Sequence, residues 1–107
     1  MARLDQLLLD PTRLGIVSLL AAADWAEFGF VRDSVGLSDS ALSKQVTTLA
    51  RSEYVEVRKG YVGKRPRTWL NLTEQGGAAL AEHMAALQDI AESARVKGAG
   101  HQSEPAG

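Results

Sequence analysis

The sequence contains no cysteine and no long hydrophobic run. None of its 107 residues is a cysteine, which excludes disulfides, thiolate metal sites and a cysteine nucleophile. The apolar run at residues 19–23 is far too short to span a bilayer. The first residues lack the basic cluster and apolar segment of a signal peptide. We therefore expect a cytoplasmic protein with one domain and one hydrophobic core.

The motifs of common catalytic sites are also missing. There is no glycine-rich phosphate loop, no zinc-binding His-Glu-x-x-His, no nucleophile elbow and no pair of convergent carboxylates. The segment Gly60-x-x-Gly63-Lys64 lacks the spacing and the following hydroxyl of a phosphate loop. Two histidines without cysteine are too few soft ligands for a metal sensor. We expect no enzymatic activity, no metal site and no cofactor.

The net charge is small, but the charges are unevenly distributed. The chain carries a net charge of −1, yet residues 44–67 hold seven cations and two anions, while the remainder holds five cations and eleven anions. Such a one-sided distribution steers a polyanion toward one face. On charge alone, a nucleic-acid surface and a merely solvated basic surface explain the pattern equally well.

The first 36 residues predict two helices that cover a core. Asp10 is a good N-cap and Pro11 suits the first helical position, so a helix should run from there to about residue 23. Residues 24–27 could add a short strand, and a second helix at about 28–35 should end at Gly36. The apolar positions assigned to the N-terminal stripe and the first helix are Leu4, Leu7, Leu8, Leu14, Val17, Leu19 and Leu20.

The third predicted helix, at residues 39–51, has two chemically different faces. Ser38 can cap it. Leu42, Val46 and Leu49 lie at positions i, i+4 and i+7, so they form one buried stripe. The opposite face is basic and rich in hydroxyl groups, without an acid or a large apolar residue; it holds Ser40, Ser43, Lys44, Thr47, Thr48 and Arg51.

Two strands and a long helix complete the chain. Residues 54–59 and 67–72 alternate in hydrophobicity, which predicts a hairpin with one buried face. The glycines and the proline between them predict a connection longer than two residues. Thr73 should cap a helix from Glu74 to about Arg95. The domain is therefore expected to span residues 1–95, and residues 96–107, rich in Gly, Ser and Pro, are expected to form a disordered tail.

This order of elements predicts a mostly helical α+β fold with a small β-hairpin, the winged helix-turn-helix. A helix fits the major groove of B-DNA, and a basic hairpin tip can reach the neighbouring minor groove. Short hydroxyl side chains can approach base edges, while cations neutralise phosphates. The predicted DNA-binding residues are Ser38, Ser40, Ser43, Lys44, Thr47, Thr48 and Arg51 on the helix, with Lys59, Lys64, Arg65 and Arg67 on the hairpin.

Four stretches of the chain resemble the short winged-helix DNA-binding regulators related to the MarR superfamily. They are Leu9–Arg13, Val35–Lys44, Tyr54–Gly60 and Lys64–Thr73, and the resemblance covers about residues 4–87. It implies a dimeric transcription regulator with its recognition helix at residues 39–51. It also implies a wing formed by residues 54–72, with the loop of the wing at residues 60–66.

Two features depart from that family pattern. Many relatives have a glycine where this chain has Glu53, so Glu53 must accept a left-handed backbone or the helix must end differently. Glu53 also places an anion close to the predicted DNA face. Thr47 and Thr48 stand where relatives often carry basic residues. From these features we expect a lower DNA affinity than that of a typical relative.

The N-terminal leucines and the last helix predict a homodimer. The last helix is long for so small a domain, and its apolar residues repeat at three- and four-residue steps. We expect His83 to be a histidine whose hydrogen bonds are satisfied within the interface rather than a pH or ligand sensor. The predicted interface residues are Leu4, Leu7, Leu8, Leu80, His83, Met84, Leu87, Ile90 and Ala91.

The favoured function is that of a sequence-specific regulator of transcription that binds double-stranded DNA as a dimeric repressor on an inverted-repeat operator. One alternative is a winged-helix protein-interaction module that docks a partner through the hairpin or Trp69; another is a non-specific nucleoid-binding protein. Trp69 is expected to pack against Tyr54 or Arg58 rather than to bind a partner. Control by a small-molecule effector is left open, and no membrane partner is expected.

Overall fold

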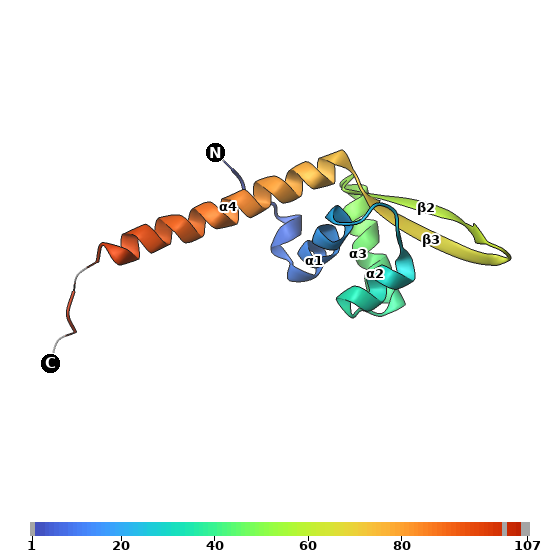
Figure 1. Cartoon of the computed structure of the whole chain (residues 1–107), viewed down its shortest axis with the longest axis horizontal. Coiled ribbons are helices and arrows are strands. Elements are labelled where there is room, and N and C mark those ends of the chain that lie inside the picture. The colour runs from blue at the N-terminus through green and yellow to red at the C-terminus, as the bar shows by residue number, and fades with distance from the viewer. Residues whose placement is uncertain (1, 102, 106–107) are drawn as a thin grey trace.

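The computed structural model describes residues 2–101 and 103–105, so the ends of the predicted domain and tail at residues 1, 102 and 106–107 lie outside the described residues. The elements are η1 (Leu7–Leu9), α1 (Pro11–Ala21), β1 (Ala26–Glu27), α2 (Phe28–Val35), α3 (Asp39–Arg51), β2 (Val55–Val62), β3 (Arg65–Leu72) and α4 (Glu74–Ala99). Helices α1–α3 form a cluster, with the β2–β3 hairpin projecting from one end and α4 from the other (Figure 1). The predicted winged helix-turn-helix is confirmed.

The helix boundaries follow from local side-chain chemistry. Asp10, Ser38 and Thr73 each accept a backbone N–H from the first turn of the helix that follows, and so begin α1, α3 and α4. Gly36 ends α2 with φ 69°, a left-handed conformation in which glycine avoids a steric cost. These predicted caps are confirmed.

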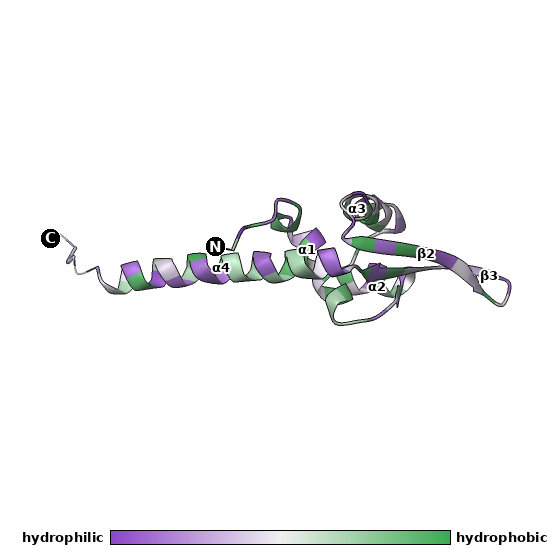
Figure 2. Cartoon of the chain, turned by 90° about the horizontal axis from the view of Figure 1, so that it is seen from above, coloured by the Kyte–Doolittle hydropathy of each residue, from purple (hydrophilic) through white to green (hydrophobic). Residues whose placement is uncertain are grey.

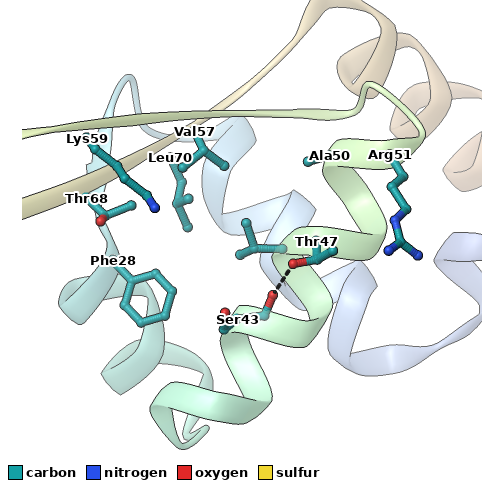
Figure 3. A pocket seen from close by; sticks show the side chains of 10 residues that line it. Phe28, Ser43, Thr47, Ala50, Arg51, Val57, Lys59, Thr68 and Leu70 are labelled. Carbon is teal, nitrogen blue, oxygen red and sulfur yellow. Dashed lines mark hydrogen bonds between the residues drawn. The ribbon is translucent and has the colours of Figure 1, made fainter.

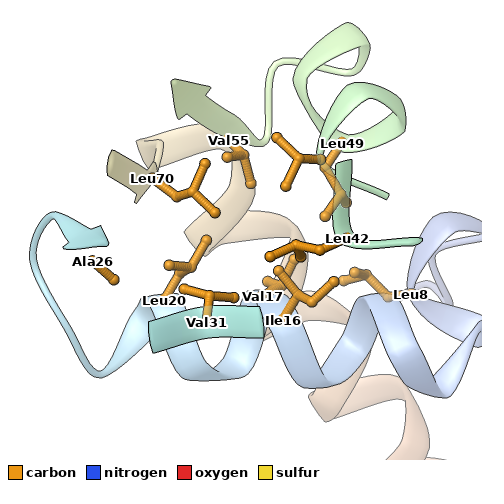
Figure 4. Packing of buried hydrophobic residues seen from close by; sticks show 11 residues of the cluster. Leu8, Ile16, Val17, Leu20, Ala26, Val31, Leu42, Leu49, Val55 and Leu70 are labelled. Atoms are coloured by element: carbon orange, nitrogen blue, oxygen red, sulfur yellow. The ribbon is translucent and has the colours of Figure 1, made fainter. Parts of the chain in front are cut away.

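One core fills the space between α1–α3 and the sheet (Figure 4). In α1 the inward face differs from the prediction, because Ile16 is fully buried while Leu14 and Leu19 are only partly buried. Most of α1 is apolar, so hydrophobic spacing did not identify the buried side. The buried members of the core are Leu8, Ile16, Val17, Leu20, Ala26, Val31, Leu42, Val46, Leu49, Val55 and Leu70.

Leu7 and Leu8 of the N-terminal leucine stripe lie in a single 3-10 turn, η1, and Leu4 precedes it. The central residue of this turn, Leu8, is fully buried in the core of the protomer. A side chain without accessible surface has nothing to offer a second copy, so we leave Leu8 out of the proposed dimer interface, contrary to the prediction. The short predicted strand does form as β1, which pairs antiparallel with β3 through Ala26 and Leu70.

The hairpin is tighter than the sequence suggested. Strands β2 and β3 pair from Val55↔Leu72 to Val62↔Arg65, which leaves a two-residue turn of Gly63 and Lys64. The predicted longer loop is wrong. Gly63 has φ 63°, the positive value that such turns require.

Pro66 lies within the ladder of this hairpin, paired with Tyr61. The pair that closes a two-residue hairpin exchanges hydrogen bonds, so the next pair does not. The nitrogen of Pro66 therefore points away from β2. Strand β1 reaches only Trp69 and Leu70, so the missing N–H leaves no unpaired ladder position.

Helix α4 ends at Ala99, four residues beyond the predicted end at Arg95, so the first part of the predicted tail is helical. Arg95 and Glu92 form an i,i+3 ion pair at 2.6 Å in this last part, an interaction that favours helix. Every residue from 88 to 99 is exposed, and this half of α4 lies clear of the body (Figure 2). The molecule consequently measures 73 × 31 × 20 Å.

Candidate nucleic-acid interface

Helix α3 turns its polar face outward. Leu42, Val46 and Leu49 are buried, as the spacing predicted. The opposite side is a shallow hollow whose lining is the polar face predicted from the sequence, and we call these residues the recognition face: Ser40, Ser43, Lys44, Thr47, Thr48 and Arg51. Ser38 lies beside this face at the N-cap, where its hydroxyl accepts the N–H of Ala41 at 3.1 Å.

Two threonine hydroxyls of the recognition face already donate within the helix. Thr47 Oγ1 donates to the carbonyl oxygen of Ser43 at 2.9 Å, and Thr48 Oγ1 donates to that of Lys44 at 3.1 Å. Each oxygen keeps lone pairs as acceptors. Against base edges, both side chains are suited to accept from the amino groups of adenine or cytosine, while their methyl groups suit the thymine methyl.

The base of the hairpin faces α3 across a hollow of about 610 Å³. Ser43, Thr47 and Arg51 line it from α3, and Lys59 and Thr68 line it from the sheet (Figure 3). Its apolar lining is Phe28, Val46, Ala50, Val57 and Leu70. Three of the predicted helix residues and Lys59 thus line one concave surface.

The sheet pairing defines which hairpin residues share that side. Val57↔Leu70 and Lys59↔Thr68 face the hollow, and we call this the inner side of the hairpin. Side chains alternate along a strand, so the next inner pair toward the tip is Tyr61↔Pro66. Tyr61, which the sequence analysis did not assign, is therefore on the same side as the recognition face.

Five predicted cations are exposed and uncompensated. Within the part of the chain that the structure describes, Lys44, Arg51, Lys59, Lys64 and Arg65 take part in none of the ion pairs. Lys64 and Arg65 lie at the tip of the hairpin, as predicted from their position between the strands. Lys44, Arg51 and Lys59 line the hollows beside α3, and a group of free cations there is the electrostatic signature of a polyanion-binding surface.

Arg67 differs from these five cations. Its Nε lies 2.9 Å from Oε1 of Glu27, and its pairing with Gly60 places it on the outer side of the hairpin. Its charge is therefore compensated, unlike that of Arg65, which lies on the same outer side through its pairing with Val62. We therefore leave Arg67 out of the interface, contrary to the prediction.

An ion-pair group also compensates the acid at the start of α3. Arg32 binds Asp33 at 2.9 Å and Asp39 at 2.8 Å. Its hydrogen bond holds the pKa of Asp33 below the usual value, and the two carboxylates raise the pKa of Arg32. Asp39, next to the recognition face, is thus matched by a cation.

Glu53 adopts the left-handed backbone that the sequence analysis considered, with φ 63°. Its N–H donates to the carbonyl oxygen of Ala50, and the N–H of Tyr54 donates to that of Leu49, both at 3.0 Å. This is the Schellman pattern of helix ends. Thr73 Oγ1 also donates to the carbonyl oxygen of Glu53 at 2.6 Å, so the strained residue is held from two sides.

His83 belongs to a polar cluster inside the protomer. It is 1% exposed, and its Nδ1 accepts the backbone N–H of Asp5 at 2.9 Å. The carboxylate of Asp5 accepts the hydroxyl of Tyr54, and this bond together with partial burial raises the pKa of Tyr54 to about 12. Because His83 is buried and its Nδ1 is satisfied by Asp5 within the same chain, we leave it out of the proposed dimer interface, contrary to the prediction.

Trp69 lies on the outer side of the hairpin and is partly buried. It pairs across the strands with Arg58, whose guanidinium carbon lies 4.4 Å from the ring centroid of Trp25. The ring of Trp69 also lies against Gly60, where an added Cβ would approach it to 3.2 Å. The two tryptophans therefore brace the outer side of the hairpin.

The remaining predicted dimer residues lie along α4 and in the N-terminal segment. Ile90 is 54% exposed, Leu4 and Met84 are about two-fifths exposed, and Ala91 is exposed. Leu7, Leu80 and Leu87 are partly buried. A groove of about 770 Å³ runs between residues 2–4 and α4. In the described residues, no helix is long and apolar enough to cross a membrane, and no cluster of His, Asp and Glu could hold a metal ion.

Comparison with known proteins gives one family match and several similar folds. A family model described as winged helix DNA-binding domain matches residues 12–91. A protein of Methanocaldococcus jannaschii that is described as uncharacterized is 22% identical over 81 residues, which is 76% of this chain and 88% of that protein.

Solved structures with similar folds include three regulators. The transcriptional regulator homologue of Pyrococcus horikoshii is 25% identical, with a TM-score of 0.77 over 83% of this chain and 88% of its own. The PcaV transcriptional regulator of Streptomyces coelicolor is 21% identical, with a TM-score of 0.67 over 94% of this chain and 67% of its own. The zinc-responsive MarR family member ZitR of Lactococcus lactis is 21% identical, with a TM-score of 0.57 over 86% and 62%. The resemblance to MarR-related regulators is confirmed at the level of the fold.

Proposed function

Since the chain belongs to the family of winged helix DNA-binding domains, we propose that it is a sequence-specific regulator of transcription that binds double-stranded DNA as a homodimer and represses by covering a promoter. Family and fold point to a DNA-binding regulator rather than to an enzyme. In this proposal α3 enters the major groove, and the hairpin follows the backbone toward the neighbouring minor groove.

One observation carries the proposal. The recognition face and the inner side of the hairpin border the same hollow, which Arg51 and Lys59 line. Lys44 lines the neighbouring hollow on α3, and Lys64 and Arg65 extend the positive charge to the tip of the hairpin. Lys44 and the hydroxyls of α3 suit base edges, whereas Lys59 and Arg51 suit phosphates. A surface with this shape and charge fits a duplex better than a flat protein partner.

The homodimer is proposed from the exposed half of α4. Ile90 in this half, 54% exposed, and Met84 just before it, 40% exposed, are not buried within the protomer. Association through this half and the N-terminal segment would place two recognition faces symmetrically about a two-fold axis. Half-sites about one helical turn apart in an inverted repeat would match that symmetry.

Selection from a pool of random duplexes tests both specificity and symmetry. We expect enrichment of an inverted repeat with two short half-sites. Enrichment of no sequence despite tight binding would favour the non-specific nucleoid-binding alternative. Absence of duplex binding at low salt would remove the proposal and leave the protein-interaction alternative.

Substitutions identify the surface that binds. Lys44→Ala and Arg65→Ala are each expected to weaken binding to the selected site by about 1–3 kcal/mol, roughly 5- to 150-fold, if they read bases. Arg67→Ala is the matched control, because it removes a cation of the same hairpin that is already paired with Glu27. Equal losses from all three variants in a titration of labelled duplex would contradict this assignment.

A further inference from the structure

Tyr61 is exposed to a degree that the fold does not explain. It is 74% exposed, more than any other large hydrophobic side chain in the described residues. It lies near the C-terminal end of β2, where the hairpin extends away from the helices (Figure 1). An aromatic ring held this far from the core contributes little to folding.

The sheet pairing nevertheless fixes the position of Tyr61 on the hairpin. Tyr61 pairs with Pro66 across the strands, at a position where the pair exchanges no hydrogen bonds and side chains approach most closely. The pair is on the inner side of the hairpin, beyond Lys59 and Thr68. The turn that follows carries Lys64, and Arg65 begins β3.

We propose that Tyr61, supported by Pro66, is an apolar contact of the wing with the minor groove of DNA. This inference rests on the proposed DNA binding and adds a contact that is not electrostatic. Proteins that enter the minor groove frequently combine basic side chains with an apolar side chain that packs against sugars and base steps. The cations Lys59, Lys64 and Arg65 around the pair match the phosphates on either side of such a groove.

An apolar contact and a phosphate contact respond differently to salt. Each phosphate neutralised by a cation adds about 0.9 to the negative slope of log affinity against log salt concentration. Burial of an aromatic ring releases no counterions. Loss of the Tyr61 ring should therefore weaken binding by the same factor at every salt concentration.

The test compares three single variants on the selected duplex over a range of salt concentrations. Tyr61→Ala should weaken binding roughly tenfold, the effect of losing about 50 Å² of apolar surface buried in the complex. The slope of log affinity against log salt concentration should be unchanged. Tyr61→Phe should bind nearly as the wild type, because the ring remains. Val62→Ala is the control: Val62 is 57% exposed on the same strand but on the outer side, and its loss should leave affinity unchanged.

Each other outcome overturns the inference in a distinguishable way. Unaltered binding by Tyr61→Ala excludes the contact, and a smaller salt slope means that Tyr61 only positions neighbouring cations. Equal losses from Tyr61→Ala and Val62→Ala indicate a general disturbance of the hairpin or an apolar tip that serves a protein partner. If the wild type itself binds no duplex, the proposed function fails first.

Discussion

Glu53 is a non-glycine residue in a backbone conformation that favours glycine. A non-glycine residue in the left-handed region costs about 1–2 kcal/mol, and the Schellman hydrogen bonds of Ala50 and Leu49 keep Glu53 there. We expect Glu53→Gly to raise the free energy of unfolding by about 0.5–1 kcal/mol, since the relief of strain exceeds the greater chain entropy of glycine. Urea denaturation at fixed protein concentration measures this change.

Glu53→Gln separates strain from charge. It removes the carboxylate but keeps the side chain at φ 63°, so it should not raise stability. Both variants should bind DNA more tightly at low salt, because both remove an anion near the end of α3. Equal stabilisation by Gly and Gln would show that backbone strain is not the cause.

The hydrogen bond from Tyr54 to Asp5 makes stability depend on alkaline pH. It raises the pKa of Tyr54 to about 12, above the ordinary value of about 10. The folded state thus holds this proton more tightly than the unfolded state. The stabilisation is complete below pH 10 and is lost as pH rises through about 12. In Tyr61→Phe, Tyr54 is the only tyrosine left, and its phenolate absorbance should appear with a midpoint near pH 12.

Tyr54→Phe provides the thermodynamic counterpart. It should lower the free energy of unfolding by about 1 kcal/mol at neutral pH, and the difference from the wild type should shrink between pH 10 and 12. A difference that stays constant with pH would mean that the hydroxyl does not donate to Asp5. This cluster could not be predicted from the sequence, because Asp5, Tyr54 and His83 come from three distant segments.

At the scale of elements, two adjacent glycines at the start of α4 have opposite roles. A Cβ on Gly76 would lie 2.3 Å from the carbonyl oxygen of Tyr54 and 2.6 Å from Cδ1 of Leu72, whereas a Cβ on Gly77 would meet nothing closer than 3.9 Å. Gly76 therefore lets α4 approach the sheet, and Gly77 only weakens the helix.

Alanine at each glycine should accordingly shift stability in opposite directions. Gly76→Ala should destabilise the fold by about 2–3 kcal/mol through overpacking against backbone. Gly77→Ala should stabilise it by about 0.5–1 kcal/mol through helix propensity. Chemical denaturation of both variants under identical conditions provides the comparison. A stabilising Gly76→Ala would show that α4 can move away from the sheet at little cost.

The elements could be predicted where local chemistry determines them. The caps Asp10, Ser38 and Thr73 and the stripe of α3 follow from side-chain type and spacing alone. The hairpin turn was missed because Gly60 and Pro66 look like loop residues. Gly60 instead accommodates the ring of Trp69, and Pro66 occupies a position without a ladder hydrogen bond. Both roles depend on the partner strand, which spacing does not reveal.

At the scale of the whole molecule, the recognition face was predictable while the partners of the N-terminal segment were not. A helix in a small domain must turn its polar side outward, so burying Leu42 and Leu49 also determines where Lys44 and Thr47 lie. Leu8 and His83 are residue types that suit a protomer core and a subunit contact equally well. Only the tertiary structure distinguishes these two environments.

The exposed half of α4 is where the dimer proposal is tested most directly. Ile90 and Gln88 are both exposed. Because they are two positions apart on the helix, their side chains point about 200° apart around its axis. Ile90→Asp should therefore produce a monomer at concentrations where the wild type is dimeric, as measured by sedimentation equilibrium, because a charge would be buried at the contact. Gln88→Asp adds the same charge on the opposite side and should remain dimeric. The affinity of Ile90→Asp for an inverted repeat should fall more than about tenfold, because avidity is lost, while its affinity for a single half-site should persist. If Ile90→Asp is still dimeric, this face of α4 is excluded from the subunit contact.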